Sequence, residues 1–447
     1  VELAYSAIEK EEVERVRRIE RLLGKQVEED EVVGRPLRES LSRFAGRLGN
    51  HPGRSSGMLL LPGDEPGSVR ALVRLRETKS KELVLHASNS GTDTTGEWML
   101  GGSYKYFQVS DADDVLGLAW GFSDTLERKS VLAGYRRPLI GPDLLELGLS
   151  FSYSNYDASS FAVTRIDFEG ESTVADLELV WRPLEWESES SRFALLAGLS
   201  FEDTWAANSL VVGRGEGQFV SPRIGVSLKT KEKFSRTSSS LTISGNVHRI
   251  SASDRTNLGG FDVEDRFERL AFSHLRSFKV GEWLSESGIG TFALPNPSRH
   301  NLFFKARAAV GLKNVRHLPQ RQFILGGTGS VRGYPEAPAA GDDGYLLSLE
   351  YRMRCGEAIP VGKGERITAS LAPFVDFGET FVNDPKSYES DHQLAGAGVG
   401  LQFGLPYGGS ARVHFAKPLK EIVNSGAVLE GTRSGDGRIH AMISWEF

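Results

Sequence analysis

The last ten residues, Arg438 to Phe447, restrict the possible folds of this chain more than any other segment. They alternate between apolar Ile439, Ala441, Ile443, Trp445 and Phe447 and mostly polar Arg438, His440, Met442, Ser444 and Glu446. Such alternation predicts a β-strand with one apolar face, and about ten residues is the length that a tilted strand needs to cross a bilayer. Aromatic rings also favour the membrane–water interface. The segment therefore predicts the closing strand of a transmembrane β-barrel.

The same alternation recurs from about Lys81 onward, and residues 144–154, 345–354 and 394–405 are clear examples. We count about seventeen such runs, whereas single-chain bacterial barrels have an even number of antiparallel strands. Assigning Ser159 to Asp167 to an extended hairpin leaves about sixteen strands. A large soluble all-β protein is the alternative, but its strands are usually shorter, about five to six residues. We therefore expect residues 81–447 to form an all-β transmembrane barrel.

Composition and motifs argue against several other classes of protein. Hydrophobic residues make up 39% of the chain, the mean hydropathy is −0.27, and no stretch approaches the ~18 apolar residues of a membrane-spanning helix. The net charge of −6 and the lack of a clustered basic stripe argue against nucleic-acid binding. The sequence has no GxSxG, no HExxH and no Cys/His cluster at metal spacing. We therefore expect no enzymatic activity, no cofactor and no metal.

Residues 1–80 have a different pattern, which predicts a separate α+β domain. Val1 to Ala7 suggests a strand, and apolar residues at helical spacing predict helices from Glu9 to Leu23 and from Pro36 to Leu48. Two further strands, Gly57 to Leu61 and Ser68 to Arg76, are joined by a turn rich in Pro and Gly. The predicted order of elements is β-α-α-β-β.

The connection from Val315 to Asp343 is the longest in the predicted barrel and contains a glycine-rich run that ends at Tyr334. Loops of this length are usually functional or disordered. Arg332 in this run offers a planar fork of donors that suits a carboxylate. Alternation directs Val375 and Phe377 to lipid and leaves Asp376 in the lumen. We expect the loop to fold inward and Arg332 to pair with Asp376, although Asp376 could instead simply be solvated.

These residues resemble the signature motifs of a known superfamily. Ser330 to Tyr334 resembles the VRGY/F motif of the outer-membrane assembly and secretion superfamily, and Phe374-x-Asp376-x-Gly378 resembles its wall motif. The resemblance places the signature in the sixth outer loop, and residues 1–80 resemble the periplasmic POTRA module of this superfamily. It implies a loop lock made by Val331, Arg332, Gly333, Tyr334, Phe374, Asp376 and Gly378.

Two further segments, Leu61 to Gly67 and Ala87 to Gly96, resemble the TpsB-type transporters of two-partner secretion. This resemblance implies a monomer in the outer membrane, in contact with its lipid, that moves an unfolded client protein from the POTRA module through the barrel. Client contacts are expected on a helix groove and an exposed edge strand: Leu37, Leu41, Phe44, Val69 and Leu72. Such transporters usually carry two POTRA modules and a plug helix, whereas one module is visible here.

Two other functions are compatible with the motifs. An assembly factor of the same superfamily would insert other barrels through a weak seam between its first and last strands. A passive pore or surface antigen would leave the inward loop unexplained.

By analogy with the superfamily, Trp445 and Phe447 form the C-terminal signal that the barrel assembly machinery recognises. We predict that Phe447→Ser lowers the amount of protein in the outer membrane before it affects transport per inserted molecule. Quantitative immunoblots of outer-membrane fractions would measure this, and unchanged levels would contradict the assignment.

Overall fold

Sixteen strands form a closed antiparallel barrel in the computed structural model of this protein. The structure describes residues 2–5, 46–49, 51, 53–62, 69–77, 79–92, 94–110, 113–141, 143–161, 166–183, 190–208, 213–259, 262–287, 296–362, 364–387, 389–424 and 427–447. The first eight barrel strands are β4 (Lys81–Ser88), β5 (Met99–Phe107), β6 (Val115–Ser123), β7 (Arg128–Ile140), β8 (Leu145–Phe161), β9 (Ile166–Trp181), β10 (Ser191–Asn208) and β11 (Arg214–Lys231). The other eight are β12 (Ser235–Gly245), β13 (Glu268–Phe278), β14 (His300–Gly311), β17 (Asp343–Gly362), β18 (Glu365–Phe381), β19 (His392–Gly404), β20 (Gly409–Pro418) and β23 (Arg438–Glu446).

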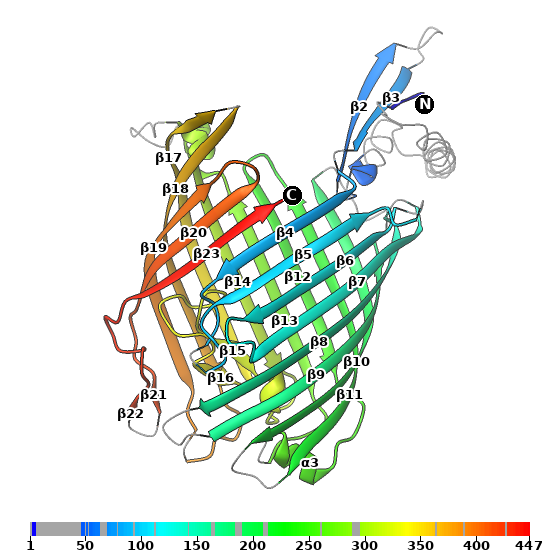
Figure 1. The fold of residues 1–447 in the computed structure, drawn as a ribbon. Helices are drawn as coiled ribbons and strands as arrows, with labels where there is room; N and C mark the ends of the chain where they lie inside the picture. Colours follow the sequence, from blue (N-terminus) through cyan, green and yellow to red (C-terminus); the bar gives the residue numbers. More distant parts are fainter. Residues whose placement is uncertain are drawn as a thin grey trace.

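The predicted barrel and its strand number are confirmed. Each strand pairs with its sequence neighbours, and β23 pairs with β4 to close the sheet (Figure 1). The extended hairpin is also confirmed, because β8 runs to Phe161 and β9 begins at Ile166. Closure matters because a bilayer offers no water to satisfy the backbone groups of an open sheet edge.

The outer face of the barrel is apolar, as the alternation predicted. On β8, Leu149 and Phe151 are 45% and 49% exposed, and on β18 Val375 is 45% exposed while its neighbour Asp376 is 0% exposed. Apolar side chains therefore face lipid and polar ones face the lumen, as in other membrane barrels.

No helix in the described part of the chain has both the length and the apolar character needed to cross a membrane.

A three-stranded sheet precedes the barrel and contains β1 (Glu2–Tyr5), β2 (Arg54–Pro62) and β3 (Val69–Glu77). Its order is β1-β3-β2, with β1 parallel and β2 antiparallel to β3. The three predicted strands are present. The predicted helix from Glu9 to Leu23 lies outside the described residues, as does all of the second helix before residue 46; residues 46–48 are helical.

One prediction for this sheet was wrong. Leu72 was expected on an exposed edge strand, but β3 is bonded there to β1 as well as to β2. Val69 of β3 precedes the stretch that pairs with β1. The spatial order of strands differs from their order along the chain, because the N-terminal strand returns parallel to β3. Among the described strands, β1 and β2 form the two edges.

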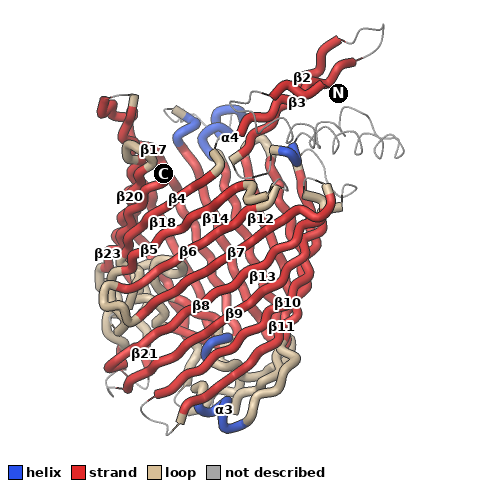
Figure 2. The backbone as a smooth tube through the Cα atoms, turned by 45° about the vertical axis from the view of Figure 1, so that its right-hand side comes forward, coloured by secondary structure: helices blue, strands red, loops and turns tan. Residues whose placement is uncertain are grey.

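Two buried arginines connect the N-terminal residues to the barrel. Arg47 Nη1 lies 3.1 Å from Asp143 Oδ1 in the turn between β7 and β8. Arg54 of β2 holds Asp113, between β5 and β6, through bonds of 2.7 and 3.1 Å. The small sheet is therefore at the end of the barrel that also carries the C-terminus (Figures 1 and 2).

The long connection between β13 and β14 contains a helix that the sequence did not predict. Helix α4 (Val280–Ser287) follows β13 directly, and the 3-10 helix η2 (Pro297–Arg299) leads into β14. Trp283 of α4 packs against Phe278 at a ring distance of 5.8 Å. Helix α4 lies at the same end of the barrel as the N-terminal sheet (Figure 2). Helix α3 (Ala252–Asn257) lies at the opposite end, which is called the loop end below.

Leu241 and Ser240 on β12 offer a test of the two faces. Leu241 pairs with Phe272 on the lipid side, and Ser240 pairs with Ser273 on the lumen side. Leu241→Arg should cost about 2–4 kcal/mol of barrel stability if the site lies near the bilayer midplane, whereas the matched control Ser240→Arg should cost much less. Equal losses in denaturant unfolding from lipid vesicles would contradict this orientation.

Candidate functional site

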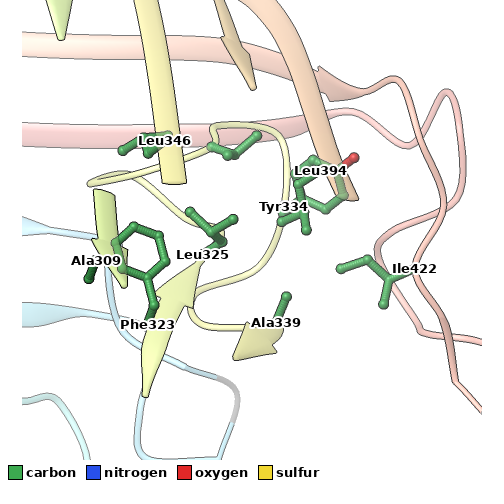
Figure 3. Packing of buried hydrophobic residues seen from close by; sticks show 9 residues of the cluster. Ala309, Phe323, Leu325, Tyr334, Ala339, Leu346, Leu394 and Ile422 are labelled. Atoms are coloured by element: carbon green, nitrogen blue, oxygen red, sulfur yellow. The ribbon is translucent and has the colours of Figure 1, made fainter. Parts of the chain in front are cut away.

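The connection between β14 and β17 folds into the barrel. It contains η3 (Pro319–Arg321) and a short hairpin of β15 (Phe323–Leu325) and β16 (Ala339–Gly341). An apolar cluster inside the barrel joins this loop to the wall, as Figure 3 shows. Its members are Ala309, Phe323, Leu325, Val331, Tyr334, Ala339, Leu346, Leu394 and Ile422. The predicted inward loop is therefore present.

Arg332 of the loop binds Asp376 of β18, as predicted. Its Nε lies 2.7 Å from Oδ2 and its Nη2 lies 2.9 Å from Oδ1, which makes a two-point contact. The backbone N–H of Arg332 also donates to Oδ2, at 3.1 Å. Arg332 is 6% exposed and Asp376 is 0% exposed. Such charge-assisted bonds with two contact points fix both distance and orientation.

A second carboxylate, Glu350 of β17, completes the contacts of the guanidinium. Arg332 Nη1 donates to Glu350 Oε2 at 2.7 Å, and Ser348 Oγ donates to Asp376 Oδ1 at 2.6 Å. The guanidinium carbon of Arg332 also lies 3.4 Å from the ring centroid of Phe374. The sequence prediction included Phe374 but missed Glu350, although its position on the polar face of β17 was a usable signal.

The residues after and before Arg332 anchor the loop further. The Tyr334 hydroxyl donates to Lys420 O at 2.6 Å and accepts from Ala395 N at 3.1 Å, and Tyr334 is completely buried. Val331 is also buried, in the apolar cluster. Lys305 of β14, which the sequence did not indicate, donates to Gly329 O at 2.7 Å.

Three glycines allow the loop and the wall to approach. Gly333 has φ +101, a left-handed conformation that favours glycine. Gly396 of β19 pairs with Asp376, and a Cβ there would lie only 2.0 Å from Arg332 O. Gly378 faces Leu325, whose Cδ1 would lie 2.8 Å from an added Cβ.

The base of the loop is fixed at the loop end of the barrel. Arg316 holds Glu389 through bonds of 2.6 and 2.5 Å, and these bonds lower the pKa of Glu389 below its usual range. The neighbouring His317 is 2% exposed, and burial lowers its pKa. Arg321 forms an ion pair with Glu202 of β10. The loop therefore has ionic contacts with the connection between β18 and β19 and with the wall strand β10.

The other predicted site residues lie elsewhere or outside the described part of the chain. Leu37, Leu41 and Phe44 fall outside the described residues. Phe447 is 68% exposed and exchanges two backbone hydrogen bonds with Leu83, and Trp445 pairs with Leu85. Among the described residues, no group of His, Cys, Asp or Glu side chains could hold a metal ion.

The substitution Gly396→Ala tests whether the close approach of the loop to the wall requires a glycine at this position. Gly396→Ala should displace the loop and cost about 1–3 kcal/mol of stability, because the added methyl overlaps the Arg332 carbonyl. Gly148→Ala on β8 is a matched control, since its Cβ would meet nothing closer than 3.8 Å. Hydrogen exchange of residues 326–334 should become faster only in the Gly396 variant.

Comparisons with known proteins agree with this architecture. Residues 276–444 match the Omp85 superfamily domain. The heme/hemopexin transporter protein HuxB of Haemophilus influenzae (strain 86-028NP) is 21% identical over 394 residues, which cover 87% of this chain and 65% of HuxB. The chain thus spans just under two thirds of the length of that relative.

Two solved structures share the fold. CdiB from Escherichia coli has a TM-score of 0.70 at 17% identity, over 90% of this chain and 69% of CdiB. BamA from Haemophilus ducreyi lacking POTRA domains 1–3 has a TM-score of 0.55 at 14% identity, over 91% of this chain and 78% of that one. The similarity of residues 276–444 to the Omp85 superfamily domain, together with the sixteen-stranded barrel that contains them, identifies an outer-membrane β-barrel.

Proposed function

We propose that this protein secretes a partner protein across the outer membrane, as in two-partner secretion, and that the inward loop is the lock of its pore. The observation that carries the proposal is the burial of Arg332 between Asp376 and Glu350 inside the lumen. A loop that lay only on the outer surface would not contact two carboxylates of the lumen wall. The name of the relative HuxB, a transporter protein, supports the same class of function.

The lumen at the N-terminal end suits an unfolded chain in transit. A cavity of about 850 Å³ there is lined by charged side chains of both signs, among them Arg47, Lys105, Asp113, Glu146 and Arg223. These charged side chains of both signs can form polar contacts with an extended polypeptide whatever its own charge. We take this cavity as the entrance of the path.

The N-terminal sheet would receive the client in the periplasm, as a POTRA module does. Its β2 strand is bonded to β3 on one side only among the described strands, and Leu59 and Leu61 on it are 50% and 41% exposed. An extended client segment adding to an open strand edge is a common recognition mode. The edge of β2 thus replaces Leu72 as the expected contact. Val69 and the helix groove of Leu37, Leu41 and Phe44 stay proposals.

The seam of the barrel, where the first and last strands meet, is closed by a short ladder. Five consecutive residue pairs join β23 to β4, from Met442 and Ser88 to Glu446 and Val84. Phe447 and Leu83 extend the pairing through bonds of 2.8 and 3.2 Å. This seam is the shortest ladder of the barrel, because every other junction has at least eight pairs. Transport is preferred over barrel assembly because the relative HuxB is named a transporter protein.

Secretion of a co-expressed partner protein into the medium tests the proposal. We predict that Arg332→Ala and Asp376→Ala each abolish secretion while the barrel remains inserted and heat-modifiable on gels. Removing one partner of a buried ion pair leaves an uncompensated charge, typically at a cost of about 3–5 kcal/mol.

Arg236→Ala is the control, because Arg236 is an exposed arginine of β12 outside this network. It should secrete normally. Normal secretion by Arg332→Ala would refute the lock.

A further inference from the structure

Three consecutive residues of the last strand contact both the chain after β4 and the inward loop. They are Ile439, His440 and Ala441. The regular ladder between β23 and β4 ends where Met442 pairs with Ser88. Beyond that point the chain leaves β4, so the next backbone groups of β23 lose their strand partner. An unpaired N–H or C=O in the wall of a membrane barrel is costly.

Asn89 supplies the missing partner with its side chain. Its Nδ2 donates to Ile439 O at 2.8 Å, and its Oδ1 accepts from Ala441 N at 2.7 Å. Its own backbone N–H donates to Ala441 O at 3.2 Å. The carboxamide thus presents one donor and one acceptor, as a strand residue does.

His440, between these two residues, faces the lumen and holds the loop. Its Nε2 accepts from the backbone N–H of Gly333 at 3.3 Å, and its Nδ1 lies 3.2 Å from Thr328 Oγ1. A neutral ring protonated on Nδ1 satisfies both contacts. His440 is 3% exposed. Thr328 and Gly333 of the loop are therefore both attached to the last strand.

We propose that Asn89 and His440 are positioning residues that couple the loop lock to the barrel seam. His440 fixes Gly333, next to Arg332, on β23. Asn89 fixes Ile439 and Ala441, the two neighbours of His440, on the chain that follows β4. Freeing the loop should loosen the seam, and freeing the seam should loosen the loop, because coupling between two sites is reciprocal. This inference concerns the barrel wall and does not require a client.

The chemistry of Asn89 is specific. Alanine offers neither group, and aspartate keeps the acceptor for Ala441 N but loses the donor to Ile439 O. The two substitutions should therefore affect the seam to different degrees. Ser90 is a matched control in the same turn, since its hydroxyl contacts Ser88 Oγ at 2.8 Å.

Hydrogen exchange of the whole chain in detergent micelles tests the coupling. Asn89→Ala should speed exchange at least about tenfold in a peptide spanning residues 439–444, because two hydrogen bonds are lost. It should also speed exchange in residues 326–334. His440→Ala should speed both segments as well, and Ser90→Ala should change neither.

Two results would overturn the proposal. Unchanged exchange at residues 439–444 in Asn89→Ala would show that Asn89 does not hold the seam. Faster exchange confined to the seam in Asn89→Ala and to the loop in His440→Ala would show that the two are not coupled. If Asn89→Ala does not fold, Asn89→Asp serves instead, and it should show a smaller effect on both segments.

Discussion

The guanidinium of Arg332, buried inside a membrane barrel, is the constraint on which the described site depends. A buried charge needs partners, and Asp376 and Glu350 supply them from two adjacent strands. To reach them, the loop backbone must pass close to the wall, which explains Gly396 opposite Asp376. Tyr334 and the apolar cluster then hold the chain on either side of the ion pair.

Much of this fold could be predicted from the sequence, because few backbone structures can span a bilayer. Every backbone group must be paired, so the sheet must close, and every second residue must be apolar. The alternation around Val375 was enough to direct Asp376 into the lumen. Since Arg332 lies in the longest loop, its pairing with Asp376 also followed from charge and position.

Other features depend on spatial neighbours that the sequence does not reveal. Glu350 becomes a site residue only through the register between β17 and β18, and His440 only because the loop reaches β23. The position of β3 at the centre of its sheet depends on β1 returning parallel to it. Helix α4 was missed because an eight-residue helix between two strands gives a weak periodic signal.

We propose that the Arg332 ion pairs keep the loop inside the pore. Single-channel recordings in planar lipid bilayers test this proposal, with Arg332→Ala compared with the unmodified protein and with Arg236→Ala. We expect a higher conductance or more frequent opening in Arg332→Ala alone, because the loop loses its ion pairs with the wall. Identical conductance in all three proteins would contradict it.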